Sequence, residues 1–309
     1  MLKYMADVRS LINMALTTFL LFFLWQNGSQ MSWPTFLLVY GAQLLLAVIV
    51  AVMSHNHQHL PMWRSKFMNL LTDLWLSMFY GFPIFAWIPT HNKNHHVHIN
   101  TDEDYTRTYR VTEKNNFLTL ITYPSISGYF QQKPVYNYYK GLWSSDRTKF
   151  FMATSQILVI AVFVITALVL NWKKALLFVI IPQQISLYFV LIFNYVQHIH
   201  ADEETKYNNS RNFTGAILNF LLLNNGYHTA HHISGRTHWS ELKEKHASIV
   251  HKIHPSLNEE NFFWFLFRVY FLGSFIESYS SKNMRLARME GKPIAGSTDT
   301  HEPLTRQTA

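Results

Sequence analysis

Four long apolar runs alternate with polar stretches along this chain of 309 residues. A run of about 20 apolar residues spans the hydrocarbon core of a bilayer as a helix, at about 1.5 Å per residue. The first two runs are separated by a short uncharged stretch containing Gly28, and the last two by residues 171–174, which favours two helical hairpins. The pattern therefore predicts four transmembrane helices, at Leu11–Trp25, Pro34–Met53, Phe150–Leu170 and Ala175–Tyr195.

A further apolar run, Leu70–Pro89, is interrupted by three residues that do not suit a regular membrane span. Asp73 is charged, Gly81 lowers helix propensity, and Pro83 breaks the backbone hydrogen-bond ladder. Irregular backbone at membrane depth is tolerated only where protein or water satisfies it. We therefore expect this run to form a re-entrant or interfacial helix that does not cross the membrane.

Two apolar stretches near the C-terminus are too short or too polar to cross a membrane. Phe213–Leu223 is short, and Asn261–Ile276 carries Arg268, so both are predicted to be helices lying at the membrane interface. Residues 1–290 are expected to form a single membrane-embedded domain. The polar segment 291–309 is expected to be a disordered C-terminal tail.

The charges are distributed unevenly between the two sides of this predicted topology. The formal net charge is +8, which is also found in nucleic-acid-binding proteins. However, 24 of the 26 Lys and Arg residues lie on one side, and only Lys173 and Lys174 lie on the other. Positive residues favour the cytoplasmic side of a membrane. We therefore expect no nucleic-acid partner, and we expect both termini and the polar segments to be cytoplasmic.

The chain contains 17 histidines and no cysteine. The absence of cysteine excludes disulfides, iron–sulfur clusters, thiolate haem and cysteine-ligated zinc. Most of the histidines fall in four clusters, each beside a predicted membrane helix or the interrupted run. These clusters are HNHQH (His55–His59), HNKNHHVH (His91–His98), NYVQHIH (Asn194–His200) and GYHTAHH (Gly226–His232).

Their spacing suits a shared metal site. In a helix, His55 and His59 lie on one face, while His57 points away; by the same rule His91 and His95 share a face, with His96 beside them. Crowded imidazoles repel one another once protonated, so such clusters persist best when a metal keeps them neutral. Imidazole suits zinc, copper, iron and nickel alike, and the number of histidines indicates two metals.

The series HxxxH, HxxxHH, NxxxH and HxxHH, arranged around four spans, resembles the membrane fatty acid desaturase superfamily, whose relatives include alkane monooxygenases and carotenoid oxygenases. The resemblance implies an all-α integral membrane fold with four transmembrane helices, interfacial helices and a cytosolic His-rich cap. It also implies a di-iron site, with Asn194 reaching the metal through water. The implied metal ligands are His55, His59, His91, His95, His96, His198, His228, His231 and His232.

The resemblance further implies O₂-dependent oxidation of an unactivated C–H bond in a fatty acyl or other lipid chain. Desaturation is favoured by HWSEL (His238–Leu242), which is similar to desaturase sequences. Hydroxylation of an alkane, acyl or carotenoid-type substrate is the alternative, because NYxxH and Thr101–Asp104 are similar to alkane monooxygenases. Residues 254–256 do not continue into the haem-binding motif of cytochrome b5. Electrons are therefore expected from NAD(P)H through a separate ferredoxin, rubredoxin or cytochrome b5-type protein.

Residues flanking the clusters are candidates to hydrogen-bond the metal-bound imidazoles, because such outer groups orient metal-ligating histidines. They are His57, His98, His200, Asp104 and Asp202, although the carboxylates could equally form a solvated acidic face. Four other histidines are expected at the soluble surface: His238, His246, His251 and His254.

The sequence favours the oxidase over two functions of other classes. A histidine-rich metal transporter would place its ligands near the bilayer midplane, whereas here the centres of the spans contain no histidine. A non-catalytic lipid-binding protein with degenerate histidine clusters would have lost ligands, whereas the implied set is complete.

Overall fold

The protein is described by a computed structural model covering residues 1–292 and 303–304. The described residues are almost entirely helical, as predicted, and contain one small parallel sheet of two two-residue strands. Apart from residues 291, 292, 303 and 304, the predicted disordered tail lies outside the described residues.

The chain forms two compact units that are interleaved along the sequence. Unit 1 comprises Met1–Trp87 and Val135–Val190, and unit 2 comprises Ile88–Pro134 and Leu191–Ala309. The division falls within two helices, α5 (Phe117–Ser145) and α7 (Ile181–His198), so each of them contributes to both units. A single membrane-embedded domain over residues 1–290 stays a prediction.

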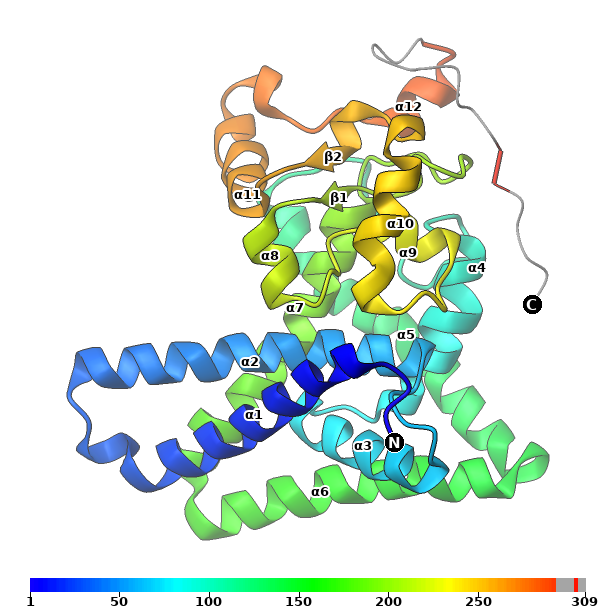
Figure 1. The fold of residues 1–309 in the computed structure, drawn as a ribbon. Helices are drawn as coiled ribbons and strands as arrows, with labels where there is room; N and C mark the ends of the chain where they lie inside the picture. Colours follow the sequence, from blue (N-terminus) through cyan, green and yellow to red (C-terminus); the bar gives the residue numbers. More distant parts are fainter. Residues whose placement is uncertain (293–302, 305–309) are drawn as a thin grey trace. The chain divides into compact units, whose positions relative to one another are not determined.

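Unit 1 is built from long apolar helices (Figure 1). Within it α1 contacts α2, α2 contacts α3, and α3 contacts α6. Its remaining elements are the second part of α5, the first part of α7 and short turns. The bounds are η1 (Met5–Asp7), α1 (Val8–Asn27), η2 (Gly28–Gln30), α2 (Trp33–His59), α3 (Lys66–Tyr80), η3 (Ile84–Ala86), α6 (Arg147–Ala175) and the π-helix η5 (Leu176–Ile180).

Among the described residues, three helical segments are long and apolar enough to cross a membrane. They are Met5–Gln30, Trp33–His59 and Arg147–His198. The third has 52 residues and includes both spans predicted between residues 150 and 195. Its helix is interrupted at Asn171, whose φ of −166° and ψ of 103° are not helical. A bent helix pair, Lys66–Tyr80 with Ile84–His98, would raise the number of spans to four.

The break predicted in the apolar run at residues 70–89 is confirmed. Helix α3 ends at Tyr80, and Gly81 takes the left-handed conformation with φ of 79°, which a residue with a side chain rarely adopts. A Cβ at this position would also lie 2.5 Å from Cβ of Gln183. Gln156 stabilises the break, since its Oε1 accepts hydrogen bonds from Ser77 Oγ at 3.2 Å and the Phe85 amide at 3.0 Å.

Polar side chains inside the apolar helices of unit 1 bond to backbone carbonyls. Tyr40 Oη donates to the carbonyl of Leu177 at 3.0 Å, and Gln43 Nε2 donates to that of Phe178 at 2.9 Å. Both carbonyls belong to the π-helix η5, which ends two residues before Pro182. These bonds satisfy groups that would otherwise be costly in an apolar surrounding.

Unit 2 contains shorter elements and the histidine clusters. Besides parts of α5 and α7, it has η4, a π-helix (Ile88–His95), α4 (His96–His98), β1 (Asn212–Phe213), α8 (Ala216–Leu221), α9 (His228–Ile233), η6 (Trp239–Glu241), α10 (Leu242–Ile249), η7 (Val250–Lys252), η8 (Pro255–Leu257), β2 (Asn258–Glu259), α11 (Phe262–Tyr270), η9 (Leu272–Ser274), η10 (Glu277–Tyr279) and α12 (Met284–Met289). The helices expected near residues 213–223 and 261–276 are present as α8 and α11.

Helix α5 was not predicted from the sequence. Its two prolines and its polar residues interrupt the apolar pattern that would indicate a helix.

Three of the four histidines expected at the soluble surface are buried instead. Only His251 is exposed. His238 and His254 are buried because they end short loops: the Nδ1 of each accepts the amide of the serine two residues later, at 3.3 Å for Ser240 and 3.1 Å for Ser256. His246 is buried against the ring of Tyr227, with the ring centroids 5.1 Å apart.

Candidate metal centre

Seven histidines of unit 2 converge into two groups. The ligand nitrogens of each group lie within 4.8 Å of one another. The four-histidine group consists of His95, His198, His228 and His232, and the three-histidine group consists of His91, His96 and His231. Each group draws on both the second and the fourth sequence cluster.

The four-histidine group is buried and tightly packed. The Nε2 of His198 lies 2.9 Å from that of His228 and 3.2 Å from that of His232, and the last two are 3.0 Å apart. His95 completes the group, with its ring centroid 4.6 Å from that of His198. These side chains come from three separate elements, which are η4, the end of α7 and α9. The group therefore depends on the relative positions of these three elements.

The three-histidine group depends on the π-helical geometry of η4. His96 Nε2 lies 3.1 Å from His91 Nε2 and 3.0 Å from His231 Nε2. Residues five apart come together in a π-helix, whereas an α-helix brings together residues four apart. The expectation of a common face for His91 and His95 therefore holds only for their rings, which stack 5.1 Å apart. Their ligand nitrogens belong to different groups.

The nitrogen–nitrogen distances fit a metal better than a hydrogen-bond network. A ring nitrogen that carries a proton donates a hydrogen bond and cannot accept one. Three mutually close imidazole nitrogens therefore cannot be hydrogen-bonded along all three of their separations. Imidazole nitrogens bound at about 2.1 Å to one metal are separated by roughly 3.0–3.4 Å for right-angle to tetrahedral geometry. The distances of 2.9–3.2 Å within the four-histidine group lie at the short end of this range. The residues present therefore fit a metal ion.

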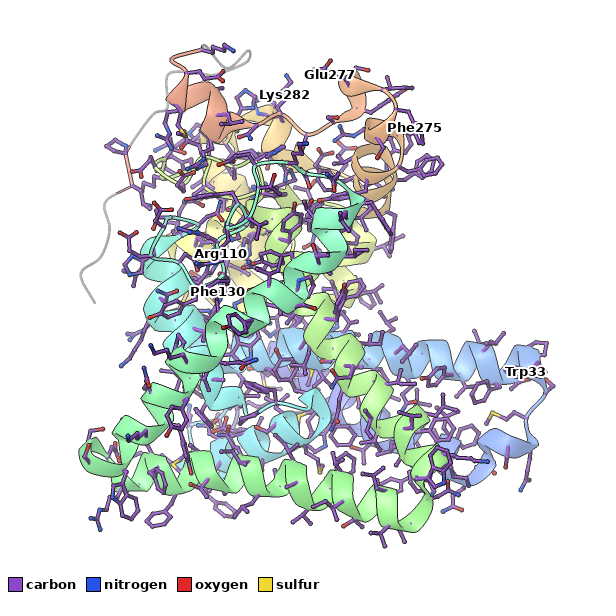
Figure 2. All side chains as sticks on the ribbon, turned by 180° about the vertical axis from the view of Figure 1, so that it is seen from behind. Trp33, Arg110, Phe130, Phe275, Glu277 and Lys282 are labelled. Atoms are coloured by element: carbon purple, nitrogen blue, oxygen red, sulfur yellow. The ribbon has the colours of Figure 1, made fainter. Side chains whose placement is uncertain are left out.

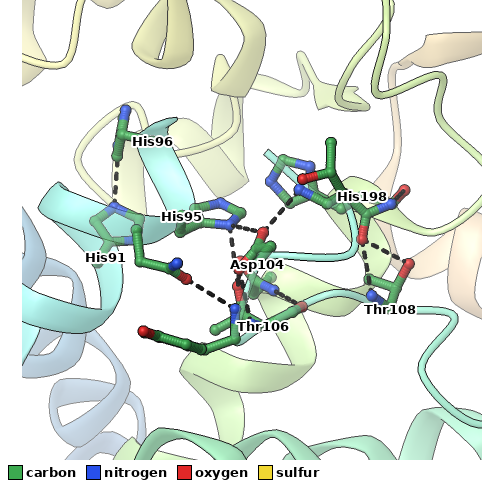
Figure 3. Close-up of polar contacts among 12 residues, drawn as sticks. His91, His95, His96, Asp104, Thr106, Thr108 and His198 are labelled. Atoms are coloured by element: carbon green, nitrogen blue, oxygen red, sulfur yellow. Dashed lines mark hydrogen bonds and ion pairs between the residues drawn. The ribbon is translucent and has the colours of Figure 1, made fainter. Parts of the chain in front are cut away.

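A hydrogen bond fixes the outer nitrogen of His95, as Figure 3 shows, and another fixes that of His198, which sets the direction of the inner nitrogens. His95 Nδ1 donates to Asp104 Oδ2 at 2.7 Å, and His198 Nδ1 donates to the carbonyl of Asn209 at 3.0 Å. Each ring then presents the unprotonated Nε2 to its neighbours. His95 Nε2 is buried and has no hydrogen-bond partner among the described residues, as expected for an atom reserved for a metal.

Asp104 is held by a loop built around its carboxylate. It is fully buried and also accepts the amides of Asn100 and Thr106, each at 2.7 Å, and the Thr106 hydroxyl at 2.8 Å. Burial alone would raise the pKa of this carboxyl. The neighbouring His95 ring and the donated hydrogen bonds outweigh burial and hold the pKa well below its usual range. Asp104 thus stays ionised and keeps the His95 proton on Nδ1.

The same loop is anchored to helix α5. Arg110 donates to the carbonyl of Asp104 at 2.7 Å, and its guanidinium carbon lies 4.1 Å from the ring centroid of Phe130, as the labelled pair in Figure 2 shows. Tyr123 Oη donates to the carbonyl of Thr106 at 2.5 Å. The loop after the second histidine cluster is therefore fixed at both its side chains and its backbone.

Burial favours the neutral form of His232. It lowers the pKa of this side chain well below its ordinary value, and the neighbouring imidazoles, His228 foremost, lower it further. Neutral imidazole is the form that binds a metal. His232 is therefore in the protonation state that metal binding requires.

Two other predicted ligands belong to unit 1. His55 and His59 lie in the last turns of α2, with their ring centroids 4.9 Å apart, and the His55 ring stacks on Trp87 at 5.2 Å. The side-by-side placement expected from the HxxxH spacing is thus present. Their participation in a metal centre stays a prediction.

Asn194 is placed by a neighbouring tyrosine. Its amide nitrogen donates to Tyr123 Oη at 2.6 Å and lies 3.4 Å from the carbonyl of Thr106. Asn194 therefore belongs to the network that carries Asp104. Its contact with a metal through water stays a prediction.

Of the residues expected to support the metal-bound imidazoles, Asp104 contacts His95, one of the seven clustered histidines. His57 Nε2 faces Asp73 Oδ1 at 3.3 Å, and His200 bonds through its two ring nitrogens to Ser281 and to the carbonyl of Glu113. Asp202 accepts from Arg288 Nε at 2.7 Å. His98 is half-buried, and its Nδ1 has no hydrogen-bond partner among the described residues. A supporting role for these four stays a prediction.

Several residues of the site were missed from the sequence. Thr106, Asn100 and Asn209 contact Asp104 or His198 directly. The only available signal was the concentration of Asn, Asp and Thr directly after the second and third clusters, since these residues readily bond to nearby backbone and side chains.

Comparison with protein-family models gave one match. The model described as fatty acid desaturase aligns with residues 31–264, a stretch that includes all four histidine clusters. The chain belongs to the fatty acid desaturase family. Searches of curated proteins and of solved structures found no match to this desaturase family member.

Family membership and the observed geometry agree on the class of chemistry. Members of this family are di-iron oxidoreductases, and the clustered histidines of this desaturase family member could hold metal. Its apolar helices, taken with the family, indicate an integral membrane protein that oxidises lipid.

Proposed function

We propose that this protein is a membrane desaturase that uses two irons and O₂ to convert a –CH₂–CH₂– unit of a fatty acyl or other lipid chain into –CH=CH–. The observation that carries the proposal is the convergence of seven imidazoles into two groups within unit 2 of a fatty acid desaturase family member. The reaction consumes one O₂, two electrons and two protons, and releases two waters.

The ligand set proposed for the two irons divides along the two groups. His95, His198, His228 and His232 would hold one ion, and His91, His96 and His231 would hold the other. His55 and His59 are proposed to complete the second group, which has fewer histidines from unit 2. When bound, the two irons supply the O₂-dependent oxidation of a C–H bond.

The chain's own residues contribute orientation and protonation state. Asp104 keeps a proton on His95 Nδ1, and the carbonyl of Asn209 keeps one on His198 Nδ1, so that both Nε2 lone pairs stay available. The burial of the four-histidine group limits the access of water to this part of the centre. Electrons are proposed to come from NAD(P)H through a separate protein of the ferredoxin, rubredoxin or cytochrome b5 type.

We further propose four transmembrane spans, with the histidine clusters and both termini cytoplasmic. The separation of Lys and Arg between the two sides supports this orientation. The break at Asn171 supports two spans within Arg147–His198. Helices α8 and α11 are proposed to lie at the interface, because Ile217, Phe220 and Phe263 are exposed apolar side chains.

The function is tested by lipid analysis and metal content. Cells expressing the protein should accumulate unsaturated chains detectable by mass spectrometry, and the purified protein should carry about two irons. His231→Ala should abolish the product and reduce the iron content, while His251→Ala, at an exposed histidine, should do neither. An alcohol in place of the alkene would make the enzyme a hydroxylase. Full activity and iron retention in His231→Ala would contradict the di-iron assignment.

A further inference from the structure

The segment Asn209–Asn212 is a buried polar strand between the third and fourth histidine clusters. Its four side chains are each at most 1% exposed, which is unusual for the sequence Asn-Ser-Arg-Asn. It leads directly into β1, and all of it lies in unit 2. We refer to these four residues as the 209–212 strap.

Alternate residues of the strap bond to the end of helix α7. The carbonyl of Asn209 accepts the Nδ1–H of His198 at 3.0 Å. The backbone amide of Arg211 donates to the carbonyl of Gln197 at 2.6 Å, and its Nη1 donates to those of Val196 and Ile199 at 2.8 and 3.1 Å. The last carbonyls of a helix lack intrahelical partners and carry partial negative charge, so a guanidinium is well suited to cap them.

The two other residues of the strap bond to helix α9 through Thr229. Ser210 Oγ lies 3.0 Å from the Thr229 hydroxyl, which also receives a hydrogen bond from Asn212 Nδ2 at 3.0 Å. Asn212 Oδ1 accepts the Thr229 amide at 2.9 Å. Thr229 directly follows His228 and lies three residues before His232, so the strap holds the helix that carries both histidines.

Arg211 is the anchor of the strap on α7, and its burial is energetically costly. It is 1% exposed, forms no ion pair within 4 Å among the described residues, and leaves its Nε without a hydrogen-bond partner there. Its guanidinium carbon lies 4.8 Å from the ring centroid of Phe265, a cation–π contact that offsets part of the lost hydration. Such a group is retained where its geometry matters, since a guanidinium keeps its charge even when buried.

We propose that the 209–212 strap is a positioning element that sets the separation between His198 and the pair His228 and His232, with Arg211 and Thr229 as its two anchors. The inference rests on the proposed metal centre, and it concerns the four-histidine group alone. The strap is linked to the three-histidine group through helix α9, which carries His231. Loosening either anchor therefore affects one metal position more than the other.

The test uses cobalt(II) as the probe, added to full-length, metal-free protein in detergent. Its visible absorption and the number of ions bound report on the two positions, and thermal unfolding of the metal-free protein reports on stability. The variants are Arg211→Met and Thr229→Val, with Arg236→Met as the matched control at an exposed arginine. Thr229→Val keeps the approximate size of the side chain and the hydrogen bond from the amide of residue 229 to Asn212 Oδ1. It removes only the hydroxyl.

Both strap variants should weaken one of two cobalt positions by about 10- to 100-fold, the range found when groups behind metal ligands are removed. The other position should weaken less, because only His231 of its histidines lies on α9, and the control should stay unchanged. Unaltered affinity at both positions would overturn the inference, as would equal weakening of both in step with lost thermal stability. If Arg211→Met does not fold, Thr229→Val alone decides. A wild-type protein that binds no cobalt would instead refute the metal centre itself.

Discussion

The two units of the molecule both expose large apolar residues, but they differ in the charged side chains that they bury. In unit 1, large apolar residues are turned outward: Leu38 is 76% exposed, and Val169 is 81% exposed. In unit 2, polar residues are turned inward, with Asp104 fully buried and Arg211 almost so. The first arrangement suits a hydrocarbon solvent, and the second suits a site that must hold fixed dipoles and ligands.

The two units therefore differ in the kind of sequence information that determines their structure. The helices of unit 1 are defined by length and apolar composition, so many sequences would form them. The loops of unit 2 are defined by individual donor–acceptor pairs, such as those of Asp104 and Thr229. Single substitutions should therefore be more damaging in unit 2.

The largest effect is expected at Asp104. Asp104→Ala leaves the buried His95 ring and the amides of Asn100 and Thr106 without their acceptor, at a cost of about 3–5 kcal/mol in the free energy of unfolding. The metal content should fall at the same time. Asp104→Asn retains an acceptor and should lose less. Chemical unfolding in detergent, followed by circular dichroism, measures both, and equal stability of Asp104→Ala and wild type would refute the role of this carboxylate.

A smaller effect is expected from a matched pair of leucines in unit 1. Leu24 is fully buried in a cluster with Ala167 and Phe178, so Leu24→Ala should cost about 2–3 kcal/mol of stability, mainly through lost packing. Leu170 is 70% exposed, and Leu170→Ala should change stability by less than about 0.5 kcal/mol. The same unfolding experiment compares the two. Similar costs at both positions would contradict the outward orientation of apolar residues in unit 1.

The smallest effects are expected at two glycines. A Cβ on Gly226 would lie 2.1 Å from the carbonyl oxygen of Phe213, so Gly226→Ala must displace backbone beside the fourth histidine cluster, at a cost of about 1–3 kcal/mol. A Cβ on Gly141, in helix α5, meets nothing within 4 Å. Gly141→Ala should be neutral or stabilise by up to about 1 kcal/mol. Thermal unfolding compares the stability of the two variants. A Gly226→Ala variant as stable as the wild type would contradict the expected cost of displacing this backbone.

Much of unit 1 and the grouping of the histidines could be predicted from the sequence, because apolar length and HxxxH spacing are local properties. The break at Gly81 and the convergence of the histidines in unit 2 agree with those predictions. Helix α5 could not be predicted, since Pro124 and Pro134 lie inside it. The burial of Arg211 and the partners of Asp104 depend on contacts between distant segments, which no local pattern encodes.

The π-helical stretch Ile88–His95 decides which of the two histidine groups His91 joins. A π-helical turn contains about one residue more than an α-helical turn. In the wider turn, His91 Nε2 faces His96 Nε2, although the rings of His91 and His95 stack on each other. Two histidines four residues apart in one short segment can thereby direct their ligand nitrogens to different groups.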